Sequence, residues 1–136
     1  MSKISIIIAS ERIDKLYPAA TLAVTAANMG WESEMFFTFW GLLALKKNYV
    51  PNEVSSDYKM FEDDLRNAMV SGALLSWNEL IMHGKKSGKL KIYACSTTMS
   101  LLNIKTNDLV DYVDGVVGAA TFLNSAKDSN ITLFIS

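Results

Sequence analysis

One stretch, Lys91-Ile-Tyr-Ala-Cys95-Ser-Thr-Thr-Met99, decides the fold predicted for this chain of 136 residues. Its first four residues predict a short strand, and residues 98–103 predict a helix, so that Cys95 ends the strand and a tight loop follows it. Short β-branched or aromatic runs alternate with longer helical patterns along the rest of the chain. This alternation indicates βαβ units and a parallel sheet.

The pattern predicts an α/β fold in one domain, residues 1–136, with three α/β/α layers, a mainly parallel five-stranded sheet and a flavodoxin-like outline. Asp14 is expected to cap the first helix, Pro18 to lie in its first turn and Gly30 to end it. A helical insertion is expected at about 46–76. The expected strands are 4–9, 32–39, 91–94, 116–117 and 131–135, and the other expected helices are 57–70, 76–86 and 119–127.

Composition excludes several classes of protein. Lys and Arg number 13 against 14 Asp and Glu, a balance that argues against a nucleic-acid binder. No apolar run approaches the roughly 20 residues of a membrane span, so no membrane association is expected. One cysteine cannot form an internal disulfide, which favours the cytoplasm. Half of the residues are hydrophobic, as expected for strands covered by helices and for a subunit interface.

Cys95 is the strongest candidate for chemistry. Ligands of parallel sheets bind outside the carboxyl ends of the strands, and this rule gathers Ser10, Thr38, Trp40 and Cys95 at one edge. A cysteine before a helix N-terminus has a lowered pKa, and the hydroxyls of Ser96, Thr97 and Thr98 can cap the helix or bind a sulfur-bound oxyanion. The alternative is that Cys95 is an inert, buried small side chain.

Other candidates have a plain structural interpretation. Trp40 follows the second strand at the same edge, either as a site residue or as an aromatic anchor at a subunit interface. His83, the single histidine, is expected at the surface near a helix end, and the inventory predicts no metal site and no cofactor. Met60, Met69 and Met82 are expected to fill the core, and the sequence assigns no role to Met99.

The segment around Cys95 resembles the cysteine region of the DsrE/DsrF-like superfamily, in its DsrE-like branch of sulfur-metabolism proteins, often labelled peroxiredoxin-like. Three more segments agree in order along the chain: Ile4–Ser10 leading to Asp14-Lys15-Leu16, then Phe36-Phe-Thr-Phe-Trp-Gly-Leu42, then Asp114-Gly-Val-Val-Gly-Ala-Ala-Thr-Phe122. Residues 46–76 have no clear counterpart in this superfamily.

The resemblance implies a homo-oligomer, a trimer or a multiple of one, and a cysteine that carries sulfane sulfur or thiosulfate. It also implies a small sulfur-carrier protein or a heterodisulfide-reductase-like complex as partner. Cys95 is the position of this chain that matches the sulfur-carrying cysteine of the family. The strand order implied is 4-3-2-1-5 or the flavodoxin-like 2-1-3-4-5, and the former places Trp40 beside Cys95.

The chain departs from some relatives, which have a second cysteine a few residues beyond the first. Met99, Leu102 and Asn103 stand there instead, which excludes an internal disulfide relay. We therefore expect a sulfur carrier or thiol-dependent sulfurtransferase that relays sulfur from Cys95 to a partner thiol. The alternative is a non-catalytic oligomeric scaffold or ligand-binding module with a structural cysteine.

Overall fold

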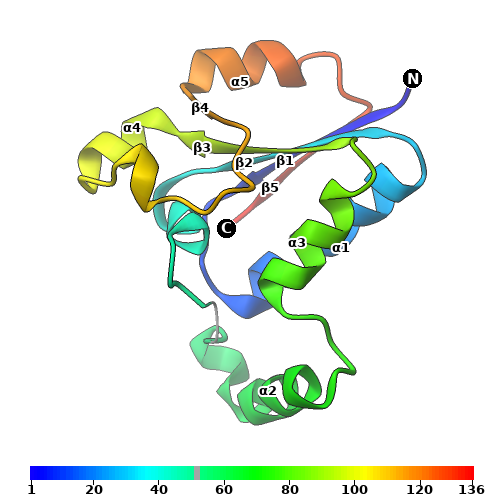
Figure 1. Cartoon of the computed structure of the whole chain (residues 1–136), viewed down its shortest axis with the longest axis vertical. Helices are drawn as coiled ribbons and strands as arrows, with labels where there is room; N and C mark the ends of the chain where they lie inside the picture. The colour runs from blue at the N-terminus through cyan, green and yellow to red at the C-terminus, as the bar shows by residue number, and fades with distance from the viewer. Residues whose placement is uncertain (51–52) are drawn as a thin grey trace.

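All five strands of the sheet are parallel and lie in the order β4-β3-β2-β1-β5 (Figure 1). The computed structural model describes residues 1–50 and 53–136. The three-layer α/β/α prediction is confirmed, and of the two strand orders considered the structure has 4-3-2-1-5. The strands are β1 (Lys3–Ile8), β2 (Glu32–Phe37), β3 (Leu90–Cys95), β4 (Gly115–Val117) and β5 (Ile131–Ile135).

Side chains of the inner strands alternate between the two faces of the sheet. Ile6 on β1 is in register with Met35 on β2, and Met35 with Ile92 on β3, so these three pack on one face. The next residue along each strand, Ile7, Phe36 or Tyr93, packs on the other. Both faces therefore need an apolar cover, which explains the nearly continuous apolar sequence of β1.

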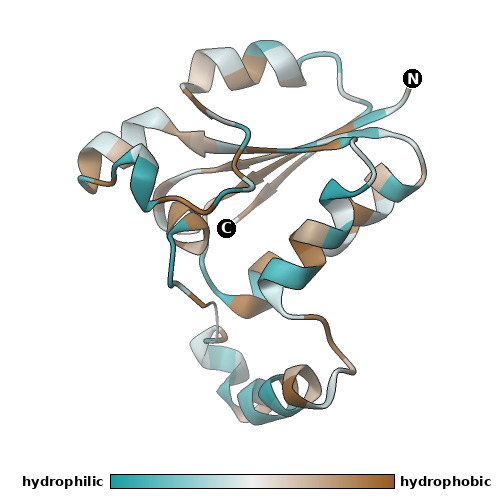
Figure 2. Cartoon of the chain, in the orientation of Figure 1, coloured by the Kyte–Doolittle hydropathy of each residue, from teal (hydrophilic) through white to brown (hydrophobic). Residues whose placement is uncertain are grey.

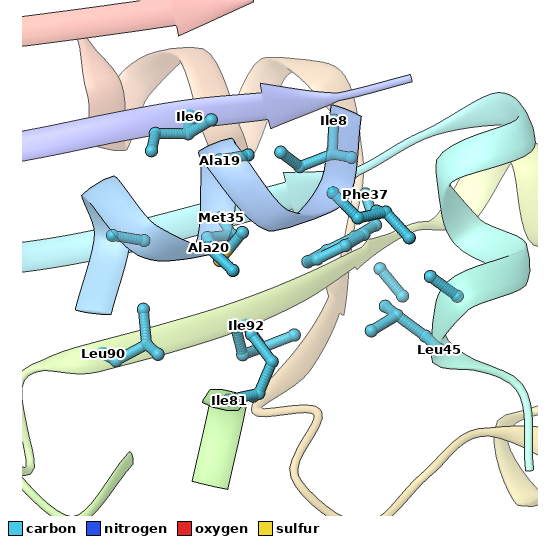
Figure 3. Close-up of a cluster of buried hydrophobic side chains, with 14 of the residues drawn as sticks. Ile6, Ile8, Ala19, Ala20, Met35, Phe37, Leu45, Ile81, Leu90 and Ile92 are labelled. Carbon is cyan, nitrogen blue, oxygen red and sulfur yellow. The ribbon is translucent and has the colours of Figure 1, made fainter. Parts of the chain in front are cut away.

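Helices α1 (Ile13–Asn28) and α3 (Trp77–Lys85) cover the first face and enclose the main core (Figure 3). Ala19 and Ala20 let α1 approach the sheet closely. Gly84 lets α3 approach α1, because a Cβ there would lie 2.7 Å from Cγ2 of Val24. Close contact between small residues thus sets the spacing of this layer.

The start of α1 differs from the prediction. Arg12, not Asp14, is the N-cap residue, and it makes no side-chain capping bond. Asp14 lies in the first turn and accepts hydrogen bonds from Ser55 N–H at 2.8 Å and Ser55 Oγ at 2.7 Å. Pro18 lies in the second turn of the helix, not the first. The carboxylate of Asp14 therefore ties a distant loop to the helix.

Over the second face lies α5 (Ala119–Ala126), across the sheet from α1 and α3 (Figure 1). The ring of Phe122 stacks on Phe36 with centroids 4.6 Å apart. This short helix leaves edge strand β5 largely open, and Phe134 is 64% exposed.

Between β2 and α3 the chain forms η1 (Phe39–Leu45), η2 (Ser56–Phe61) and α2 (Glu62–Ser71). Hydrophilic residues predominate on α2 (Figure 2). Its Leu65 and Met69 pack against Ile13 and Tyr17, so α2 lies beyond the α1–α3 layer and does not cover Cys95. Pro51 and Asn52, within the expected insertion, lie outside the described residues.

Two of the methionines expected in the core are at the surface. Met60 is 76% exposed and Met82 is exposed on α3, whereas Met69 is partly buried and Met99 is buried. The periodicity that suggested core also suits a helix packed on one side only. Within residues 1–50 and 53–136, every helix is too short or too polar to cross a bilayer.

Candidate functional site

Cys95 is the last residue of β3 and the N-cap of α4 (Ser96–Leu101). The expected loop between strand and helix is absent, because α4 begins at Ser96, two residues earlier than predicted. Cys95 keeps extended backbone angles, φ −72° and ψ 118°, and the chain turns into the helix immediately after it. The sulfur therefore lies at the carboxyl edge of a central strand, between β2 and β4.

The side chain of Cys95 points to the α5 face of the sheet. It packs with Phe36, Phe122 and Ala126, and the residue is 5% exposed. Its neighbour across the sheet is Val117, the last residue of β4. The side chain of Cys95 thus packs among apolar residues and is almost closed to solvent.

Polar groups from two chain segments surround the sulfur in this setting. Burial raises the pKa of the Cys95 thiol, but the donor groups near the sulfur, which are the Thr38 hydroxyl, the backbone and side chain of Thr98 and the backbone of Thr97, lower it by more. The net pKa lies below the ordinary value for cysteine. Donors aimed at the sulfur favour the thiolate, which is the nucleophilic form.

Thr98 holds this arrangement together. It is fully buried, and its Oγ1 accepts a hydrogen bond of 2.9 Å from the backbone N–H of Phe39. The same Oγ1 lies 3.3 Å from Oγ1 of Thr38. The loop after β2 and the first turn of α4 are therefore joined at the point where both meet Cys95.

An aromatic pair follows β2 at this edge. Phe39 and Trp40 are 49% and 53% exposed, with ring centroids 5.9 Å apart and planes at 87°. Phe39 adopts a left-handed conformation, φ +47°, which a bulky residue rarely accepts. Gly41 lies against the end of β1, where a Cβ would be 2.3 Å from the carbonyl oxygen of Ile8. The close approach of Gly41 to β1 and the bond from Phe39 N–H to Thr98 Oγ1 hold the loop, and both rings are about half exposed.

The other predicted site residues lie at the same edge at different distances from the sulfur. Thr97 is exposed, and Ser96 faces Gly118, where a Cβ would lie 3.6 Å from Ser96 Oγ. Ser10 follows β1, which β2 separates from β3, so it lies roughly 10 Å away by the strand spacing. Its Oγ accepts a hydrogen bond of 3.2 Å from Arg12 N–H.

His83 is exposed in the last turn of α3. In the part of the chain that the structure describes, no group of three or more His, Cys, Asp or Glu side chains is arranged to hold a metal ion.

Comparison with known proteins shows the family of this chain. Residues 1–72 and 53–134 match the model of the DsrE/DsrF/DrsH-like family, and the two matches overlap in the segment that contains α2. The chain belongs to the DsrE/DsrF/DrsH-like family. The resemblance inferred from the sequence is confirmed.

Relatives of this family align along nearly the whole chain. Sulfur carrier protein DsrE2 of Allochromatium vinosum is 29% identical over 157 positions, covering 98% of this chain and 98% of that protein. Uncharacterized protein YrkE of Bacillus subtilis is 29% identical over 154 positions, covering 96% and 95%. The crystal structure of the ychN protein from E. coli has a TM-score of 0.70 at 14% identity, covers 98% and 99% of the two chains, and shows the shared fold.

Within this DsrE/DsrF/DrsH-like fold, sequence reasoning placed Cys95 at the correct edge but did not select Thr38 as a site residue. Thr38 directly follows β2, so its position at the carboxyl edge was visible in the sequence. What brings it to Cys95 is the pairing of β2 with β3, in which Phe37 is in register with Ala94. The sequence signal for Thr38 was a hydroxyl one residue past the end of a strand. This signal identifies Thr38 as a neighbour of Cys95 only when the strand order is known.

Proposed function

We propose that this protein is a sulfur carrier that holds sulfane sulfur or thiosulfate on Cys95 and relays it to a partner thiol. The observation that carries the proposal is the lowered pKa of Cys95 within hydroxyl and amide donors from Thr38, Thr97 and Thr98. Membership of the DsrE/DsrF/DrsH-like family and the name of the DsrE2 relative support sulfur as the cargo.

Loading follows from thiolate chemistry at Cys95. The thiolate attacks the outer sulfur of a polysulfide or the sulfane sulfur of thiosulfate, and a new S–S bond forms to Sγ. The donor's own S–S bond breaks, and its electron pair leaves on the shortened polysulfide or on sulfite. With tetrathionate the same attack leaves a thiosulfate unit on Cys95 and releases thiosulfate. Electrons balance in each case without another oxidant.

Discharge reverses the roles of the sulfurs. An acceptor thiolate attacks the outer sulfur of the Cys95 persulfide, and the electron pair returns to Sγ, where the donors from Thr38 and Thr98 stabilise the thiolate again. The added sulfur lengthens the side chain by about 2 Å. Because Cys95 is nearly buried, this added reach helps a partner thiol to meet the cargo.

The partners in this proposal are another thiol protein and copies of this chain. We propose a small sulfur-carrier protein or a heterodisulfide-reductase-like complex as acceptor, since the single cysteine leaves no internal thiol to complete turnover. We also propose a homo-oligomer, a trimer or a multiple of one. Exposed Phe134 on β5 and Leu123 on α5 supply apolar surface that an interface would cover.

Intact-mass spectrometry tests the carrier function. The protein is treated with polysulfide, thiosulfate or tetrathionate, and each adduct is then exposed to dithiothreitol. We expect one adduct per chain with the mass of the transferred group, removed by the thiol and absent in Cys95→Ser. No adduct on the folded wild-type protein, or an adduct that persists in Cys95→Ser, contradicts the proposal.

A second candidate is a non-catalytic oligomeric scaffold or ligand-binding module in which Cys95 is structural. The packing of Cys95 against Phe36 and Phe122 favours it, because buried cysteine commonly serves as a small apolar side chain. Alkylation by iodoacetamide separates the two candidates. A carrier reacts in the native state with a midpoint below the pH expected for free cysteine, whereas a structural cysteine reacts only after unfolding.

A further inference from the structure

A cavity of about 690 Å³ lies beside α3, on the sheet face opposite to the one where Cys95 packs. One wall is the outer side of α3, with Asn78, Met82 and Lys85 at helical spacing. The facing walls are the segments 47–48 and 110–112, which include Lys47 and Tyr112. Its volume is within the range of about 300–1,000 Å³ that small-molecule sites occupy.

Backbone pairing holds the two facing segments in place. Lys47 N–H donates to the carbonyl of Asp108, and Val110 N–H donates to the carbonyl of Leu45, both at 2.8 Å. These bonds flank an antiparallel bridge between Lys46 and Leu109. The cavity is therefore preformed, which reduces the entropy lost when a ligand binds.

The lining combines apolar surface with a few polar groups. Met82, Val110 and the ring of Tyr112 supply the apolar part, and the thioether of Met82 suits contact with an aromatic ring. The hydroxyl of Tyr112 donates to Oδ1 of Asn78 at 3.1 Å. The amide NH₂ of Asn78 is thus oriented with its acceptor oxygen occupied, and it is available to donate.

Charge at the cavity favours an anion at one position. Lys85 is engaged, because its Nζ donates to Asp114 and to the carbonyl of Leu90. Lys47 differs: among the described residues no carboxylate lies within 4.0 Å of its ammonium. Asp111 is the one acidic residue in the lining and is exposed. Among the described lining residues, Lys47 and the amides of Asn48 and Asn78 are therefore the side-chain donors left for a ligand.

We propose that this cavity binds a small planar apolar molecule carrying one carboxylate. The ring packs between Met82 and Tyr112, and the carboxylate is held by Lys47 Nζ and the Asn78 amide. The site is separate from Cys95 and does not depend on the sulfur-carrier proposal.

Methyl NMR of protein labelled with ¹³C-methyl methionine tests the site, with 2-naphthoate as probe and neutral 2-naphthalenemethanol as its uncharged counterpart. Met82 is the methionine in the cavity lining, and exposed Met60 lies outside the lining as an internal control. Met82→Leu assigns the reporter signal. We expect the Met82 methyl to shift to saturation with 2-naphthoate while Met60 stays unchanged, and we expect weaker binding of the alcohol.

Two matched lysine variants test the charge. Lys47→Gln should weaken 2-naphthoate about two- to fivefold, the range for an exposed ion pair, and leave the alcohol unaffected. Lys86→Gln removes the same charge from the residue that follows α3, outside the lining, and should change the binding of neither probe. The proposal is overturned if the Met82 methyl signal does not shift, or if the Met60 and Met82 signals shift in parallel without saturating. It is also overturned if the two lysine variants change the affinity for 2-naphthoate equally. A Met82 signal that depends on protein concentration without probe also overturns it, because the face is then an interface between copies.

Discussion

The buried Oγ1 of Thr98 accepts a hydrogen bond from Phe39 N–H at 2.9 Å, which leaves its own proton to donate toward the sulfur of Cys95. One side chain therefore joins the loop after β2 to α4 and also stabilises the thiolate. Two residues separated by 59 positions in the chain meet because β2 and β3 are neighbours.

Thr98→Val keeps the shape of the side chain and removes the hydroxyl, which accepts from Phe39 N–H and lowers the pKa of Cys95. We expect the free energy of unfolding to fall by about 1 kcal/mol, since the Phe39 N–H loses its partner. We also expect the pH midpoint for alkylation of Cys95 to rise, because one donor to the thiolate is lost. Thr97→Val is the control, since Thr97 acts through its backbone N–H. Equal midpoints for the two variants would show that the Thr98 hydroxyl does not act on the thiol.

Phe122→Leu should increase access to Cys95. The Phe122 ring stacks on Phe36 and packs over the cysteine, so a smaller side chain opens this side of the sulfur. We expect faster reaction with a bulky disulfide reagent and a loss of stability on the order of 1 kcal/mol. Leu123→Ala, on the exposed side of the same helix, should leave the reaction rate unchanged. A wild-type rate in Phe122→Leu would mean that reagents reach the sulfur from another side.

Gly41→Ala should be the most disruptive small change at the site. The added Cβ would lie 2.3 Å from the carbonyl oxygen of Ile8, and backbone must move to relieve that contact. We expect a loss of about 1–3 kcal/mol in urea denaturation. Gly115→Ala is the matched control, because its Cβ would lie 3.6 Å from the Tyr93 ring, an ordinary contact. Similar losses in the two variants would rule out the steric explanation.

Acid stability should depend on Asp14. Burial raises the pKa of this carboxyl, but the hydrogen bonds from Ser55 lower it by more, so it lies below its ordinary value in the folded protein. A lowered pKa contributes stability that is present above the unfolded pKa of about 3.9 and lost as pH falls through the folded pKa.

Asp14→Asn should therefore lower the urea midpoint at neutral pH and approach the wild type below the folded pKa. Exposed Asp128→Asn provides the control and should follow the wild-type curve throughout. A difference between wild type and Asp14→Asn that stays constant down to the most acid pH would contradict the linkage.

The sequence determined the elements of this fold through local patterns. The apolar run at 4–8 and the strand that ends at Cys95 are visible because a strand buried on both faces must be apolar. The run at 131–135 is visible through its β-branched and aromatic residues, although edge strand β5 is largely open. Gly30 marks the end of the first helix, where φ is +87°. The single cysteine and its threonine neighbours are likewise evident, so Cys95 could be chosen without a structure.

Tertiary structure alone decided which groups meet. Strand orders 4-3-2-1-5 and 2-1-3-4-5 satisfy the same βαβ pattern, because strand pairing depends on contacts between distant residues rather than on local periodicity. The observed order places β2 beside β3, and it is this neighbour that brings Thr38 to the sulfur of Cys95. Long-range packing also decided that Met60 and Met82 are at the surface. A helix that is covered on one side only leaves some of its apolar side chains exposed.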